Sequence, residues 1–215
     1  MTPTATLARI QVNPLSRAVQ RDLRDAAQMH KTLMRMLPDD LGETPRRDTG
    51  LLYRIEENDD TSTLMVQAST PLDHTRLPAD YGRTTLKDLT PMFGALRTGT
   101  NLRYRIVLNP AKRERLPLEH RNQRGKVIPL TGADADQWWN RRATEAGLHL
   151  TTALPTPVTF ARPRGKDTPA IHHSLLRYDG TATVTDPDAL TRAVLAGIGR
   201  GKPYGAGLLS LAPAH

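Results

Sequence analysis

One histidine stands where it could move a proton. His30 follows Asp25 and Gln28, whose spacing is typical of a capped helix start. Near a helix N-terminus the dipole disfavours the protonated imidazole, which leaves a neutral base near neutral pH. The apolar residues around His30 also follow helical spacing, and a buried core histidine is the commoner explanation of that pattern. The residues alone therefore leave both a proton-transfer role and a packing role open.

The remaining titratable residues do not indicate a metal site. His172 and His173 are neighbours in an expected strand, so their side chains point to opposite faces. Asp39-Asp40 and Asp59-Asp60 fall in expected turns, where solvation explains them, so a two-metal nuclease is not predicted. No Gly-x-Ser-x-Gly sequence is present. We expect no metal and no cofactor.

A glycine-rich stretch lies near the C-terminus. Residues 197–207 hold five glycines, with Arg200 and Lys202 between them. Glycine permits close backbone approach, and successive N–H groups beside cations can cradle an anion. The same composition suits a plain turn before a last strand, and the spacing does not decide between the two. It is not a Walker loop, because Pro203 follows Lys202.

Cations gather in three further segments. Each group could contact phosphates, and each could equally be solvated surface charge. The groups are Arg17, Arg21 and Arg24 in a segment expected to be a basic loop or short turn (14–24), Lys112 and Arg113 in a basic stretch (111–129), and Arg162, Arg164 and Lys166 in a loop bordered by proline and glycine.

The composition of the chain limits the kinds of binding partner that can be expected. The chain carries 30 Lys and Arg against 22 Asp and Glu, a net charge of +8 that favours a polyanionic partner, with nucleic acid the leading candidate. It has no cysteine, which excludes disulfides, thiol catalysis and cysteine zinc sites. No apolar run approaches the ~20 residues of a membrane span. We therefore expect a cytoplasmic protein with no membrane partner.

The first half of the chain has the pattern β-α-β-β followed later by a further strand. We expect a strand at 6–13, a helix at about 26–37, and a hairpin of strands at 51–56 and 63–68. After a long loop, a strand at 101–109 could lie beside the first one, since both end in Asn-Pro. This is most of a ferredoxin-like unit.

The second half repeats the pattern. Asp179-Gly180 indicates a type I′ hairpin turn, and Asp186-Pro187 indicates a helix start. We expect an α+β fold of two tandem ferredoxin-like (RRM-like) domains with antiparallel sheets. The elements expected are helices at 133–146 and 187–196 and strands at 148–153, 157–161, 171–178, 181–185 and 207–212. The domains expected are residues 1–115 and 131–215, with a basic linker at 116–130.

With these residues described, the chain resembles the precursor-RNA endoribonucleases of the type I-E CRISPR Cascade complex (the CasE family of the RAMP superfamily). The most specific match is the string Gly-Ile-Gly-x-x-Lys-x-x-Gly-x-Gly-Leu-Leu-Ser-Leu-Ala-Pro at 197–213. Less specific matches are Val12-Asn13-Pro14, Ser16-Arg17, Arg21-Asp22-Leu23, Gln28-Met29-His30, Leu102-Arg103-Tyr104-Arg105, Asn109-Pro110-Ala111-Lys112-Arg113 and Trp139 with Arg141-Arg142.

The resemblance implies metal-independent cleavage of the repeat hairpin at the 3′ base of its stem. The ribose 2′-OH would attack the adjacent phosphate and leave a 2′,3′-cyclic phosphate and a 5′-OH. The protein would bind precursor RNA, keep the mature guide RNA and join other Cascade subunits. The family's helix histidine falls on His30, which favours proton transfer over packing. Lys31 is the candidate for stabilising the pentacoordinate phosphate.

One departure from the family stands out. Relatives place a tyrosine three residues before the histidine, and here that position is Ala27. The alternative is therefore a catalytically impaired subunit that binds repeat RNA. The RNA contacts implied are the eight cations of the three segments above together with Gly199, Arg200 and Lys202.

Overall fold

The computed structural model describes residues 3–39, 49–57, 62–118, 123, 125–158 and 174–214. Alternating apolar residues build a first antiparallel sheet, in which β1 buries Ala8, Ile10 and Val12. The sheet order is β2-β3-β1-β4. Its strands are β1 (Thr6–Val12), β2 (Leu52–Glu57), β3 (Ser62–Ala68) and β4 (Gly82–Asp88).

Two helices cover one face of this sheet. α1 (Arg17–Arg24) and α2 (Ala26–Met34) share a core with it, in which Val19 and Leu33 are fully buried. The expected loop at 14–24 is therefore wrong. The Ser16 side chain caps α1 by accepting from the Val19 N–H at 3.4 Å. Although the segment is basic, the apolar face of α1 packs on the sheet.

Strands from later in the chain form a second sheet. Its strand order is β11-β5-β10-β8, and β9 also pairs with β10. α5 and α6 cover it, and Trp139, Tyr104 and Tyr178 lie in the shared core. None of the helices in the described part of the chain is long and apolar enough to cross a membrane. The elements are β5 (Asn101–Leu108), α5 (Gly132–Glu145), β8 (Leu148–Leu150), β9 (Leu154–Val158), β10 (Leu175–Val184), α6 (Pro187–Ala196) and β11 (Ser210–Pro213).

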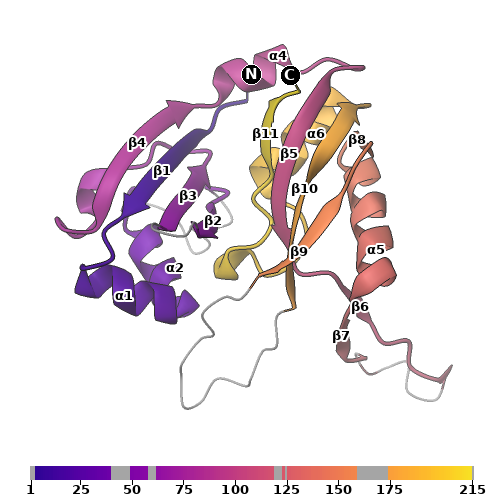
Figure 1. The fold of residues 1–215 in the computed structure, drawn as a ribbon, viewed down its shortest axis with the longest axis horizontal. Helices are drawn as coiled ribbons and strands as arrows, with labels where there is room; N and C mark the ends of the chain where they lie inside the picture. The colour runs from indigo at the N-terminus through magenta and orange to yellow at the C-terminus, as the bar shows by residue number, and fades with distance from the viewer. Residues whose placement is uncertain are drawn as a thin grey trace.

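The remaining elements are η1 (His74–Arg76), α4 (Thr90–Ala95), β6 (Ala111–Arg113), β7 (Val127–Pro129) and η3 (Lys202–Tyr204). Of these, α4 links the two sheets, β6 and β7 form a projecting two-stranded sheet, and η1 and η3 are short turns within the first and the second unit (Figure 1). Numbered within its own unit, the first sheet has the strand order 4-1-3-2, and the second sheet has the same order when β9, which lies off the main path, is left out. Together with the antiparallel pairing, this confirms the predicted fold of two tandem ferredoxin-like units.

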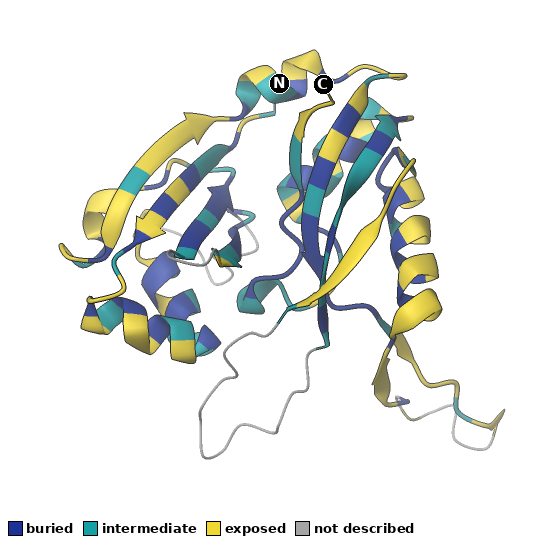
Figure 2. Ribbon diagram, viewed as in Figure 1, coloured by how far each residue is buried: buried dark blue, intermediate teal, exposed yellow. Residues whose placement is uncertain are grey.

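One strand lies in a different sheet from the one expected. β5 pairs with β10 and β11 instead of β1, whose free edge is taken by β4. The sequence does not reveal β4, because it is an edge strand exposed along almost its whole length (Figure 2). We propose that the N-terminal domain ends between α4 and β5 rather than at residue 115.

The hairpin expected at Asp179-Gly180 is also wrong. β10 runs unbroken through both residues, and a Cβ atom on Gly180 would lie 2.1 Å from the Thr152 carbonyl oxygen and 2.8 Å from the Tyr104 hydroxyl. The glycine is needed for close approach of neighbouring groups, not for a turn.

A buried arginine joins the two sheets. Arg54 on β2 is 2% exposed and donates to the Leu208 carbonyl at 3.0 Å and the Ser210 hydroxyl at 3.0 Å. Its charge is balanced by Glu56, at 2.5 Å. Nearby, the Gln67 side chain donates to the Val194 carbonyl at 2.7 Å. Buried polar contacts of this kind fix one sheet against the other.

Candidate functional site

The helix that carries His30 begins at a strong cap. The Asp25 side chain accepts from the N–H groups of Ala27 at 2.8 Å and Gln28 at 3.4 Å. This confirms the predicted helix start. His30 is half-buried and Lys31 is exposed, so the two side chains sit at the boundary between the core face of α2 and solvent.

A buried carboxylate holds α1 and α2 in place beneath this site. Asp22 is 1% exposed, and its Oδ2 accepts from the Tyr81 hydroxyl at 2.9 Å. Arg21 contacts Asp22 at 2.7 Å and donates across to the Thr32 hydroxyl on α2 at 3.1 Å. Burial raises the pKa of Tyr81, and the Asp22 charge raises it further, so the hydroxyl keeps its proton and donates.

The glycine-rich stretch turns back against the histidine helix. Its 3-10 turn η3 contacts both α2 and β2 (Figure 1). Gly201 and Gly205, both at φ 82°, flank the turn. The Tyr53 hydroxyl donates to the Pro203 carbonyl at 3.1 Å, and Lys202 Nζ donates to the Ala196 carbonyl at 2.7 Å. These bonds tie the turn to β2 of the first unit and to the end of α6 in the second unit.

Both ends of the stretch pack on the second unit. Gly199 has φ 80°, and a Cβ atom there would lie 3.0 Å from Trp138 Cη2. The Ile198 N–H donates to the Gly207 carbonyl at 3.0 Å, and the Gly207 N–H donates to the Val107 carbonyl at 2.7 Å. The stretch is therefore a tightly bonded loop whose middle, η3, contacts α2 and whose two ends pack on the second unit.

The predicted cations do not all occupy one place. Arg17 and Arg24 are exposed on α1, whereas Arg21 is tied to Asp22 and Thr32 and is only partly available. Arg200 is exposed on the loop. The helices α1 and α2 and the β6–β7 hairpin lie at one end of the molecule, opposite the end with both termini (Figure 1).

Lys112 and Arg113 lie on that hairpin and are exposed, with Arg113 donating to the Gly125 carbonyl at 2.8 Å. The structure therefore brings His30 and Lys31 together with η3 and sets the hairpin cations apart from them. The cations Arg162, Arg164 and Lys166 lie outside the described residues, as do His172 and His173.

Sequence reasoning missed the polar groups that position the helix. Asp22 was noted only as part of a family string, and Tyr81 was placed in a long loop. The separation of 59 residues between these partners explains why. A lone Asp among the apolar positions of α1 was the one available signal, because an unpaired buried carboxylate would be costly.

The fold consists of two tandem ferredoxin-like units, and the helix that carries His30 contacts a glycine-rich turn. This combination can be compared with known protein families. The chain belongs to the CRISPR-associated protein family, since the model described as "CRISPR associated protein" matches residues 7–213. This confirms the resemblance stated from the sequence.

Named relatives agree with that assignment. The CRISPR-associated endoribonuclease Cse3 of Thermus thermophilus is 33% identical over 221 residues, covering 96% of this chain and 99% of that protein. A structure of CRISPR endoribonuclease Cse3 bound to a 19-nucleotide RNA superimposes with a TM-score of 0.82 at 30% identity, covering 99% of this chain and 100% of that one. A chain of a CRISPR RNA-guided surveillance complex in a pre-nicking state is 38% identical, with a TM-score of 0.71 and coverage of 97% and 100%.

Proposed function

We propose that this protein is a CRISPR repeat-specific endoribonuclease that needs no metal ion. It binds the hairpin of the repeat transcript and cleaves at the 3′ base of the stem. The observation that carries the proposal is the placement of His30 on a capped helix that contacts the glycine-rich turn η3. Its similarity to Cse3, named an endoribonuclease, supports the same reaction class.

The chemistry proposed is attack of the ribose 2′-OH on the adjacent phosphate. His30 would take the proton from the 2′-OH or give one to the departing 5′-oxygen. The products are a 2′,3′-cyclic phosphate and a 5′-OH. Lys31, exposed next to His30, would stabilise the negative charge of the pentacoordinate phosphate.

The exposed cations would hold the RNA. Arg17 and Arg24 on α1 and Arg200 on the loop flank the His30 helix and its turn, where a phosphate backbone could contact them. The contacts proposed further away are Lys112, Arg113, Arg162, Arg164 and Lys166. After cleavage the protein would keep the mature guide RNA and join other Cascade subunits, as its similarity to a chain of a surveillance complex supports.

A cleavage assay tests the mechanism directly. The protein is incubated with repeat hairpin RNA in excess chelator, alongside the same RNA carrying a single 2′-deoxy substitution at the scissile ribose. We expect cleavage of the first RNA and none of the second. Cleavage that occurs with a divalent metal ion and stops in chelator would contradict metal independence, and cleavage of the deoxy RNA would contradict 2′-OH attack.

Ala27 supports a second candidate, a subunit that binds repeat RNA but has lost catalysis. Its side chain has no hydroxyl, at the position where relatives carry tyrosine, and its N–H is used in the cap. This candidate predicts hairpin binding without turnover, even at high protein concentration. Single-turnover cleavage that His30→Ala abolishes, with binding intact, would exclude it.

A further inference from the structure

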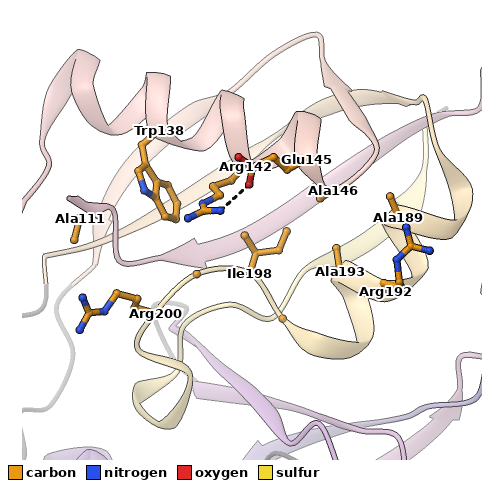
Figure 3. A pocket seen from close by; sticks show the side chains of 12 residues that line it. Ala111, Trp138, Arg142, Glu145, Ala146, Ala189, Arg192, Ala193, Ile198 and Arg200 are labelled. Atoms are coloured by element: carbon orange, nitrogen blue, oxygen red, sulfur yellow. Dashed lines mark hydrogen bonds and ion pairs between the residues drawn. The ribbon is translucent and has the colours of Figure 1, made fainter. Parts of the chain in front are cut away.

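A hollow of about 520 Å³ lies on the side of the glycine-rich loop that faces away from the first sheet. It is open to solvent and bordered by α5, α6 and residues 197–200 (Figure 3). Ala146, Ala189 and Ala193 line its walls, and their short side chains leave the space open. No residue proposed above for catalysis lies in it, and it shares Gly199 and Arg200 with the RNA contacts that the family resemblance implies.

Three guanidinium groups face this hollow at separate places. Figure 3 shows Arg200 at one end, Arg142 in the middle beneath α5, and Arg192 at the other end beside α6. The lining carboxylate is Glu145, which pairs with Arg142 at 2.6 Å. Three cations against one carboxylate leave the hollow positive. Because the cations are spread out, a single small anion would not reach all of them, whereas a chain of anions would.

The central arginine has a donor to spare. Its guanidinium lies 5.4 Å from the centroid of the Trp138 ring, and its Nε is buried without a hydrogen-bond partner. The guanidinium carries five N–H donors and bonds Glu145 through Nη1, and the side chain is 43% exposed, so an incoming phosphate oxygen can reach its outer donors. Arg142 is thus positioned by Trp138 and Glu145 but not saturated by them.

The floor of the hollow favours backbone over base recognition. One side of Trp138 is covered by Arg142, and Gly199 packs close to its ring edge. The indole is 6% exposed, so it offers no free face on which a base could stack. Beside the apolar walls, the polar groups offered to a ligand are guanidinium groups and glycine backbone, which recognise phosphates without reading sequence.

We propose that this hollow binds the sugar–phosphate backbone of a single-stranded RNA segment that flanks the repeat hairpin. The proposal rests on the proposed function, because it extends the RNA path beyond His30. One loop carries both places: η3 contacts α2, and residues 197–200 line the hollow. A strand that leaves the cleavage site along this loop meets Arg200 first and then Arg142 and Arg192.

The test compares hairpin RNA alone with hairpin RNA carrying a 5′ or a 3′ flank of about 10 unpaired nucleotides. The variant is Arg142→Ala with Arg192→Ala. We expect about 5–30-fold weaker binding of at least one flanked RNA and unchanged binding of the bare hairpin, and a salt dependence flatter by about 0.7 per lost contact. Arg141→Ala removes a charge from the same helix outside the hollow and should change neither.

Each other result is decisive. Equal loss on bare and flanked RNA, or no loss on any RNA, overturns the flank site while leaving the proposed function intact. Impaired assembly with other Cascade subunits and normal RNA binding assigns the hollow to a protein partner and also overturns it. If the wild-type protein neither binds nor cuts the hairpin, the proposed function itself has failed. Should the double variant unfold, Arg192→Glu, which does not touch Trp138, gives the same test.

Discussion

The two units serve the proposed site by different means. The first provides side chains on a helix, held from below by Asp22 and Tyr81. The second provides backbone, in a loop whose glycines at 197, 199, 201, 205 and 207 all have positive φ. Proton transfer needs a group held at one point, whereas holding a polyanion needs close approach along a path. Changes in the first unit should therefore alter cleavage rate, and changes in the loop should alter affinity.

The largest effect should come from the histidine. His30→Ala removes the proposed proton carrier, so single-turnover cleavage of repeat hairpin should fall about 10²–10⁴-fold. Affinity for the hairpin, measured by filter binding, should stay within about 3-fold, because the side chain acts mainly in the transition state. His74→Ala, on exposed η1, is the matched control. A normal rate for His30→Ala would place the chemistry elsewhere.

Next in size is the arginine between the units. Arg54→Met should lower the free energy of unfolding by about 3–5 kcal/mol, because Glu56 and two or more acceptors lose their buried partner. Urea unfolding measures it. Arg76→Met breaks the exposed pair with Asp39 and should cost far less, because water screens exposed charges. Equal costs for the two variants would show that the units do not depend on Arg54.

The hydroxyl beneath α2 should separate rate from affinity. Tyr81→Phe removes one bond to a buried carboxylate and should cost about 1.5–3 kcal/mol of stability. Well below the unfolding temperature, cleavage should still be slower with hairpin affinity unchanged, since α2 is less well positioned. Tyr178→Phe removes a similar bond to Asp136 in the second unit. If both variants slow cleavage equally, Tyr81 has only a general structural role.

Gly199, which packs against Trp138, should affect RNA affinity more than cleavage rate. Gly199→Ala should cost about 1–3 kcal/mol, because the residue has φ 80° and its Cβ would crowd Trp138. RNA affinity should fall with a smaller change in the single-turnover rate at saturating protein. Gly94→Ala, in open space on α4, should be neutral or stabilising by up to about 1 kcal/mol. If Gly199→Ala slowed cleavage without weakening RNA binding, the loop would serve catalysis and not affinity.

The smallest effect concerns pH. Burial alone would raise the pKa of Glu56, but Arg54 and Arg105 hold it below its ordinary value of 4.5. A pKa lowered on folding adds stability above the ordinary value, and that stability is lost as the pH falls through the folded value. Between pH 6 and 3, Glu56→Gln should therefore show a shallower loss of unfolding free energy than the wild type. Parallel curves would contradict a role for this carboxylate.

Local signals predicted the elements that depend on local structure. Asp25 and Asp186 cap helices where expected, and the strands at 52–57 and 62–68 pair as a hairpin. The failures involve non-local pairing. Gly180 has the sequence of a turn but is required by Thr152 and Tyr104, which lie far away in the chain. β5 was expected to pair with β1 because both strands end in Asn-Pro. The sequence of a single strand does not determine which strands lie next to it in a sheet.

The site divides in the same way. His30 was identified through a family string, since helical spacing alone also fitted a core histidine. The hollow could not be predicted from the sequence. Arg142 and Arg192 are 50 positions apart, and they line the same hollow only because α5 and α6 pack on one sheet. Arg21 was expected to bind RNA, but its bonds to Asp22 and Thr32 could be seen only in the folded helices.

The bonds of Arg54 also have a consequence for synthesis of the chain. Leu208 lies 154 positions after Arg54, so at about 5–20 residues per second the ribosome needs roughly 8–30 s to deliver its partner. The first sheet is complete at residue 88, long before that. A nascent chain therefore carries an arginine that has Glu56 beside it but lacks its acceptors at Leu208 and Ser210 until the final strand emerges. A ribosome that stalls before β11 would leave a half-built protein with that charged surface exposed to chaperones and proteases.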